Sequence, residues 1–261
     1  MAGVHASGSR LVSLSIELTV LLTAVALAAG YLSSIAGSGG LLTLPVLLWT
    51  GLPPINALAT NKLQSALGTL SSTWNFFRNG HLRLRALLPA IVLALLGSSI
   101  GTLTVQQVGN DLLLRLIPVL LIAIALYFLL SPRISDDARE ARLGRWSFAC
   151  AVALPMGFYG GFFGPGMGSI LPFLFVWLAG YSLPGATAQT KVMVLTINST
   201  SALLFVSAGQ VLWDLALVMS AAQMVGARLG SNAVMRRGTR FVQPIIIAVT
   251  LTMALKLLLW P

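Results

Sequence analysis

GSGGLLTLPVLLWTGLPPINALATNK, residues 37–62, decides the fold of this chain, because it returns later in altered form. Further along, the sequence reads GPGMGSILPFLFVWLAGYSLPGATAQTK and ends that second copy at Lys191. Pro45 matches Pro172, and after a two-residue insertion in the second copy Lys62 matches Lys191. An offset that holds across most of two halves indicates an internal duplication. We therefore predict two homologous halves, each built around one glycine-rich stretch that a proline breaks.

The composition is typical of a membrane protein. Hydrophobic residues make up 57% and charged residues 8% of the 261 residues, far from the roughly 25% charged residues of soluble domains. The basic residues, which give a net charge of +10, fall in short connections between apolar runs, as the positive-inside rule expects. We expect a lipid bilayer around the chain and no nucleic-acid partner.

Residue types that carry catalysis or bind metals are scarce. The single Cys150 excludes an internal disulfide framework. The two histidines, His5 and His81, lie outside the expected spans, which disfavours a Ser-His dyad and a histidine-bound metal. Nucleotide-binding fingerprints are also missing. We expect no enzyme activity, no metal and no cofactor.

The apolar runs predict an all-α polytopic membrane protein. The expected full spans are residues 18–36, 56–77, 86–105 and 112–130 in the first half, and 146–163, 184–206, 212–234 and 241–260 in the second. The stretch 41–50 reaches only about 15 Å as a helix, half of a bilayer core. Each half should thus hold four full spans and one short broken or re-entrant helix. A charged cytoplasmic connection, 131–145, separates the N-terminal transmembrane repeat, 1–130, from the C-terminal one, 146–261.

The charges of the loops indicate how the halves face each other. Loop 78–85 carries three arginines, whereas its repeat equivalent 207–214 carries none. Conversely, turn 106–111 has no basic residue, whereas the equivalent region 235–240 has three. Under the positive-inside rule this switch favours inverted halves, which requires an odd number of crossings in each. The alternative is a parallel arrangement in which the short helix is re-entrant.

Broken helices at matching positions of inverted repeats are typical of secondary transporters, whose substrate site lies near the midplane where the breaks meet. Each break can open a short helix with free N–H groups and a positive dipole end, which are anion-binding features. The expected contributors are Gly37, Ser38, Gly39, Gly40, Gly164, Gly166 and Gly168. The alternative is that these glycines only let helices approach closely. We assign the two GxxxG motifs, 97–101 and 226–230, to such packing.

Lys62 and Lys191 are the stronger indication of an anion site. A lysine at membrane depth costs on the order of 2.5–3.5 kcal/mol on insertion scales, and the six acidic residues all lie at expected segment ends or in loops. A bound anion would supply the missing charge. Otherwise each lysine reaches the membrane interface or donates to free carbonyls of a broken stretch.

Neutral donors could complete the site. The candidates beside the lysines are Asn61, Gln64, Ser65, Gln189, Thr190 and Asn198. The alternative is that these side chains only form hydrogen bonds between helices.

Three runs of residues carry a family resemblance. SSIAGSGGLLTLPVLLWTGLPPINALATNKLQSALGT, the later GFYGGFFGPGMGSILPF and the ATAQTK echo resemble the TauE/SafE family of membrane transporters, the sulfite exporter-like or TSUP proteins, and especially its YfcA-type members. The resemblance covers practically the whole chain. It implies secondary transport of small sulfur-containing anions such as sulfite, sulfonates or thiosulfate.

The chain departs from that family at one pair of positions. YfcA-type members commonly have an aspartate four residues before the glycine of each break, where this chain has Ser33 and Gly160. If those carboxylates carry a coupling proton in related proteins, this chain couples differently or runs as a uniporter.

The expected function is secondary transport of a small anion by alternating access at a midplane site between the two broken helices. A short chain with little soluble domain suits a bacterial inner membrane. The alternative of a different class is a membrane scaffold or assembly factor that keeps the fold without transporting. A channel is a third alternative, which saturable counterflow would separate from a carrier.

Overall fold

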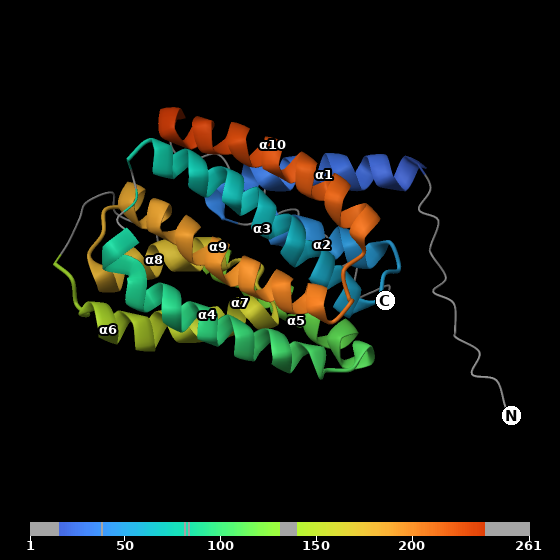
Figure 1. The fold of residues 1–261 in the computed structure, drawn as a ribbon, viewed down its shortest axis with the longest axis horizontal. Helices are drawn as coiled ribbons and strands as arrows, with labels where there is room; N and C mark the ends of the chain where they lie inside the picture. The colour runs from blue at the N-terminus through green and yellow to red at the C-terminus, as the bar shows by residue number, and fades with distance from the viewer. Residues whose placement is uncertain (1–15, 38, 81, 83, 131–139, 238–261) are drawn as a thin grey trace, which may run out of the picture.

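The computed structural model describes residues 16–37, 39–80, 82, 84–130 and 140–237, and every regular element within them is a helix (Figure 1). The elements are α1 (Ile16–Ala36), α2 (Gly39–Trp49), α3 (Pro54–Arg78), α4 (Leu84–Gln106), α5 (Asn110–Leu130), α6 (Arg145–Phe148), η1 (Ala149–Ala153), α7 (Leu154–Phe162), α8 (Met167–Ala179), α9 (Leu183–Ser207) and α10 (Trp213–Arg237). The all-α prediction is confirmed, and each expected span up to residue 234 coincides with helix. The expected span 241–260 and residues 131–139 of the connection lie outside the described residues.

The segment α6–η1–α7 is helical without interruption but contains a π-turn. The N–H of Leu154 donates to the carbonyl of Ala149, five residues earlier. The next residue, Pro155, has no N–H, and in a regular α-helix its ring would clash with the carbonyl of Ala151. A wider turn at this point relieves the clash, so the helix continues past the proline toward the second break.

The outside of the helix bundle is apolar. Among the described residues, the helices at Ile16–Ile35, Leu84–Gln106 and Leu183–Ser207 are long and apolar enough to cross a membrane, and α2 and α8 are shorter apolar helices. Large exposed side chains on α4 include Leu88, Val92, Leu95, Ile100 and Leu103. Monomeric soluble proteins rarely expose so continuous an apolar face, which here suits contact with lipid tails.

The two halves are interleaved. α1 packs along α10, and α4 packs along α7, so the first long helix of each half lies against the fourth helix of the other. A Cβ added at Gly226 would meet the carbonyl oxygen of Leu27, and one added at Gly97 would meet that of Leu154. Leu27 and Leu154 occupy equivalent positions of the repeat, at the same offset as Pro45 and Pro172. The GxxxG motifs are therefore packing contacts, made twice with the halves exchanged.

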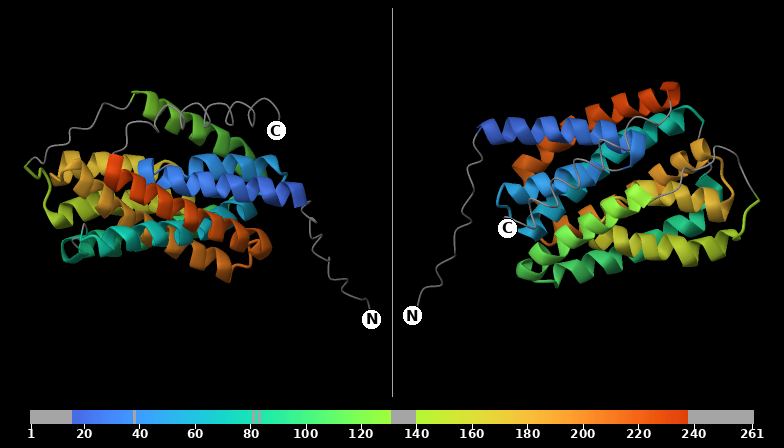
Figure 2. Two further views of the ribbon diagram at one scale, coloured as in Figure 1. Left: turned by 90° about the horizontal axis from the view of Figure 1, so that it is seen from above. Right: turned by 180° about the vertical axis from the view of Figure 1, so that it is seen from behind.

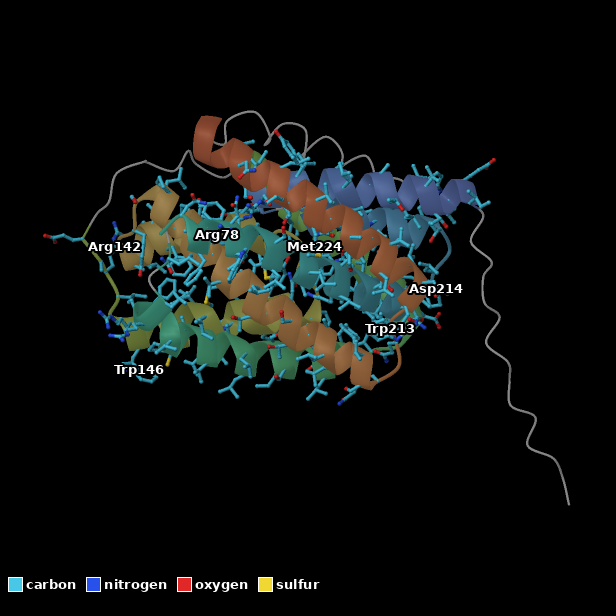
Figure 3. All side chains as sticks on the ribbon, turned by 45° about the horizontal axis from the view of Figure 1, so that its top comes forward. Arg78, Arg142, Trp146, Trp213, Asp214 and Met224 are labelled. Atoms are coloured by element: carbon cyan, nitrogen blue, oxygen red, sulfur yellow. The ribbon has the colours of Figure 1, made fainter. Side chains whose placement is uncertain are left out.

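Two pairs of long helices run in opposite directions. In Figure 1, α3 runs from right to left and α9 from left to right, and α4 and α10 are opposed in the same way. Figure 3 shows Arg78, Arg142 and Trp146 toward one end of the molecule, the basic end, and Trp213 and Asp214 at the opposite end. The molecule therefore has a basic end and an opposite end, one at each end of its long helices.

The core consists of two apolar clusters. One includes Leu44 of α2 and Ile117 of α5, and α5 (green) lies to one side of the bundle in the left view of Figure 2. The other includes Ala94 of α4, Phe175 of α8 and Met193 of α9. The buried polar side chains of α3 and α9 belong to neither cluster, and these two helices carry the candidate site.

Candidate functional site

The two broken stretches touch each other, backbone against backbone. A Cβ added at Gly37 would meet the backbone of Gly168, and one added at Gly168 would meet the backbone of Gly37. Gly37 has φ +69° and Gly164 has φ +100°, values that residues with side chains rarely adopt. Glycine is therefore required at both breaks, and the breaks lie side by side as the duplication led us to expect.

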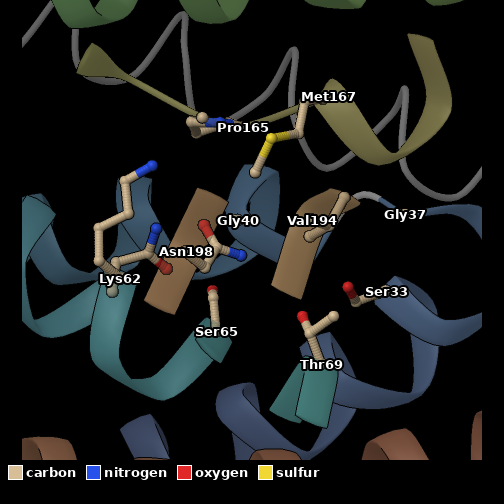
Figure 4. A pocket seen from close by; sticks show the side chains of 13 residues that line it. Ser33, Gly37, Gly40, Lys62, Ser65, Thr69, Pro165, Met167, Val194 and Asn198 are labelled. Atoms are coloured by element: carbon tan, nitrogen blue, oxygen red, sulfur yellow. The ribbon is translucent and has the colours of Figure 1, made fainter. Parts of the chain in front are cut away.

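A small pocket adjoins this contact (Figure 4). Its volume, measured as the space open to the centres of water-sized spheres, is about 30 Å³, enough for roughly two waters at the ~10–15 Å³ that each needs. Its lining consists of Ser33, Gly37, Gly40, Asn61, Lys62, Ser65, Thr69, Gly164, Pro165, Gly166, Met167, Val194 and Asn198. Both breaks and both of the polar helices α3 and α9 contribute, so the two halves build the pocket together.

The pocket contains part of the predicted site. Of the predicted contributors, Gly37, Gly40, Asn61, Lys62, Gly164 and Gly166 line it, as do the expected neutral donors Ser65 and Asn198. Gly39, Gly168, Thr190 and Lys191 are not among its lining residues. Ser38 lies outside the described residues. The pocket also includes five residues that the sequence did not mark as ligands: Ser33, Thr69, Pro165, Met167 and Val194.

One face of each polar helix points at the pocket. Lys62, Ser65 and Thr69 lie at positions i, i+3 and i+7 of α3, which share a helix face. Val194 and Asn198 occupy the repeat positions of Ser65 and Thr69, at the same offset as the two lysines. Figure 4 shows Lys62 and Pro165 at one side of the pocket and Ser33 and Thr69 at the other. Helical spacing counted from Lys62 is the sequence signal that would have found Thr69.

Each buried lysine donates a hydrogen bond to a backbone carbonyl of the other half. Lys62 Nζ donates to the carbonyl of Gly160, and Lys191 Nζ donates to that of Ser33 at 2.6 Å. Ser33 and Gly160 are repeat equivalents in the last turn before each break. The lysines are only 1% and 4% exposed, so neither reaches the membrane interface. Of the two alternatives to a bound anion, exposure at the interface is not observed. Carbonyl contact is observed, but the carbonyls belong to the helix turns before the breaks rather than to the breaks, and that of Ser33 also accepts from the N–H of Gly37.

Acidic side chains are absent from the described surroundings of the lysines. The described acidic residues, Glu17, Asp111, Glu140 and Asp214, are all exposed. Nor does this part of the chain gather three His, Cys, Asp or Glu side chains that could hold a metal ion. Carbonyl dipoles alone satisfy a buried ammonium incompletely.

The starts of the two short helices adjoin the pocket. Gly40, in the first turn of α2, and Met167, the first residue of α8, are both lining residues. The first N–H groups of a helix have no partner within it, and this end carries the positive end of the dipole. Asn61 accepts a hydrogen bond from Thr43 Oγ1 at 2.5 Å through its Oδ1. Its Nδ2 therefore faces the Gly40 side, 3.5 Å from the place of an added Cβ.

Two further polar side chains flank the breaks. Tyr159 of α7 donates from its hydroxyl to the carbonyl of Pro165 and so ties the second break to its own helix. Nothing in the sequence selects this tyrosine, because an aromatic residue in an apolar helix usually only packs. Thr190, a predicted donor, has a buried Oγ1 without a hydrogen-bond partner among the described residues. It adjoins Lys191 on α9 without lining the pocket.

An apolar helical exterior with a polar pocket at two broken helices places the chain in the class of multi-pass membrane transporters, and comparison with known proteins supports this class. The chain belongs to the family described as Sulfite exporter TauE/SafE, whose model matches residues 22–257. The family resemblance seen in the sequence is thereby confirmed.

Its relatives carry matching descriptions. The chain is 41% identical over 244 residues to a "Probable membrane transporter protein" of Haemophilus influenzae, covering 94% of this chain and 96% of that protein. It is 43% identical over 234 residues to the "Probable membrane transporter protein YfcA" of Escherichia coli (strain K12), covering 90% and 87%. It is 38% identical over 248 residues to the "Probable membrane transporter protein ORF9" of Sinorhizobium sp, covering 95% of each. No solved structure gives a significant match. The family and these names indicate a membrane transporter rather than an enzyme.

Proposed function

We propose that this protein is a secondary transporter of a small, sulfur-containing anion, which binds between the two broken helices and is exposed alternately to each side of the membrane. The observation that carries the proposal is the pair of buried lysines, Lys62 and Lys191, each of which donates to a backbone carbonyl of the other half. Buried charge inside a membrane usually marks a substrate or ion pathway.

The lining of the pocket supports an oxyanion as the solute. Lys62, Ser65 and Asn198 offer an ammonium, a hydroxyl and an amide, and charge-assisted hydrogen bonds of this kind are about twice as strong as neutral ones. The starts of α2 and α8 add the positive ends of two helix dipoles, although at α8 the N–H groups of Met167 and Ser169 already donate to the carbonyls of Gly164 and Gly166. A pocket with room for roughly two waters favours a small solute. The sulfur chemistry rests on the description of the family, a sulfite exporter family.

We further propose that the halves, 1–130 and 146–261, are inverted repeats joined by a cytoplasmic connection, 131–145. Each half then crosses the membrane through four full spans and its short helix. The opposed directions of α3 and α9 and of α4 and α10 support this arrangement (Figure 1). Under the positive-inside rule, the basic end then faces the cytoplasm, in a bacterial inner membrane.

Counterflow in liposomes tests the proposal. Purified protein is reconstituted, and the vesicles are loaded with unlabelled sulfite, thiosulfate, an alkyl sulfonate, sulfate or a carboxylate before labelled sulfite is added outside. We expect labelled sulfite to accumulate when a sulfur oxyanion is inside, and not in protein-free vesicles. Folded protein that gives no counterflow with any of these anions would overturn the proposal and favour a non-transporting scaffold. Flux that does not saturate would instead indicate a channel.

A further inference from the structure

The polar faces of α3 and α9 each end in a buried phenylalanine. On α3, the face that begins at Lys62 continues to Ser72 and Phe76, at positions i+10 and i+14. On α9, the equivalent face continues to Ser201 and Phe205. Phe76 and Phe205 are repeat equivalents, at the same offset as the two lysines, and are 4% and 0% exposed. The helix face that lines the pocket therefore ends in one buried aromatic ring in each half.

The two rings lie on opposite sides of the pocket. α3 runs toward the basic end and α9 runs away from it (Figures 1 and 3). Thr69 and Phe76 are seven residues apart on α3, about 10 Å along a helix axis. Asn198 and Phe205 have the same separation on α9. Phe76 thus lies between the pocket and the basic end, and Phe205 lies between the pocket and the opposite end.

The surroundings of Phe205 are strongly apolar. It belongs to the same buried apolar cluster as Phe163, Val105 and Leu58, whereas Phe76 is buried but belongs to neither apolar cluster.

A ring at each side of the pocket suits a gate. An apolar constriction excludes water and, with it, a hydrated anion, and alternating access needs one such barrier on each side of a single site. Mere core packing would also bury phenylalanines, but it does not require them at equivalent positions on the two faces that line the pocket.

We propose that Phe76 and Phe205 are the paired gates of the transport path, and that they open alternately to expose the pocket to the basic end and to the opposite end. This inference rests on the proposed function, because gates have meaning only if a solute passes. It also places the two phenylalanines on different sides of the pocket, Phe76 toward the basic end and Phe205 toward the opposite end.

Site-directed thiol labelling tests this assignment. Cys150 is exposed and is the only cysteine of the chain, so Cys150→Ser combined with Ser65→Cys leaves one thiol, in the pocket. An anionic, membrane-impermeant methanethiosulfonate is applied separately to right-side-out and inside-out vesicles. We expect Phe76→Ala and Phe205→Ala each to speed labelling about tenfold or more, from opposite sides, because labelling follows the population of the open state.

The neighbouring residues on the same helices provide matched controls. Phe77 and Leu203 are 49% and 69% exposed, and we expect Phe77→Ala and Leu203→Ala to leave both labelling rates unchanged. If the alanine variants do not fold, Phe76→Leu and Phe205→Leu should give the same sidedness with smaller changes.

Equal acceleration from both sides, or acceleration no greater than in the controls, would overturn the assignment. The labelling readout is separate from flux. Sidedness without sulfite counterflow would support the gates while contradicting the proposed solute, and counterflow without sidedness would contradict the gates alone.

Discussion

Replacing Lys62 by methionine should separate binding from stability. Lys62 lines the pocket and is 1% exposed, so its ammonium would meet the bound anion with little competition from water. A hydrogen bond to a charged group contributes about 1.5–3 kcal/mol, and every 1.4 kcal/mol is a factor of about ten in affinity. We therefore expect Lys62→Met to weaken sulfite binding by about 10- to 100-fold.

The same substitution should cost the fold little. Methionine keeps an unbranched side chain of similar length and removes a charge whose burial costs on the order of 2.5–3.5 kcal/mol. Against this stands the lost hydrogen bond to the carbonyl of Gly160, whose isolation costs about 1–3 kcal/mol. The two terms nearly cancel, so the melting temperature should stay within a few degrees of the wild-type value or rise slightly.

Isothermal titration with sulfite and a thermal melt, on the same purified samples, measure the two quantities. Lys191→Met is the matched control, because Lys191 makes the equivalent carbonyl contact but is not a lining residue. We expect it to reduce sulfite affinity less than Lys62→Met does. The reasoning would be refuted if Lys62→Met bound sulfite within about twofold of wild type, or if it lost affinity only because it no longer folded.

Three further substitutions test other parts of the structure. Gln64→Met should raise the stability by about 1–3 kcal/mol in a thermal melt. Both polar atoms of the Gln64 amide are buried without hydrogen-bond partners among the described residues. A lower melting temperature would show that the amide has hydrogen-bond partners in the folded protein. Gly97→Val should prevent folding, because its Cβ would meet the carbonyl oxygen of Leu154. Gly144→Val, whose added side chain would point into open space, should leave the thermal melt unchanged. Similar melts for the two variants would contradict this packing. Ser33→Asp should weaken sulfite binding in titration, because it adds negative charge to the pocket; unchanged affinity would place the anion elsewhere.

The duplication made much of the fold predictable. The offset between Pro45 and Pro172 located both short helices, and the apolar runs located the long ones, because spacing and composition are local properties of the chain. The π-turn before Pro155 was missed, since a proline in an apolar run does not reveal how its helix will accommodate it.

The candidate site was predictable only in part. Lys62 and Lys191 were identified because a lysine within an apolar span needs a reason, and Gly37 and Gly164 because the break repeats. Their carbonyl partners could not be read from the sequence, since a backbone carbonyl is present at every residue and only tertiary packing selects one.

The repeat alone does not predict which of its equivalent residues line the pocket. It treated Lys191 and Thr190 as equivalent to Lys62 and Asn61, but the pocket includes only the first-half pair. Two homologous halves need not contribute equally to one pocket, and the difference arises from their packing rather than from their sequences alone.

The most direct test of an anion site between the breaks is a crystal structure with selenite, the selenium analogue of sulfite, measured at the selenium absorption edge. We predict an anomalous peak in the pocket within about 4 Å of Lys62 Nζ, the reach of a charge-assisted hydrogen bond of about 2.8 Å and one Se–O bond. The peak should disappear in crystals of Lys62→Met. An empty pocket in wild-type crystals at saturating selenite, or peaks only on the surface, would contradict the central claim that the two lysine-bearing halves enclose an anion site.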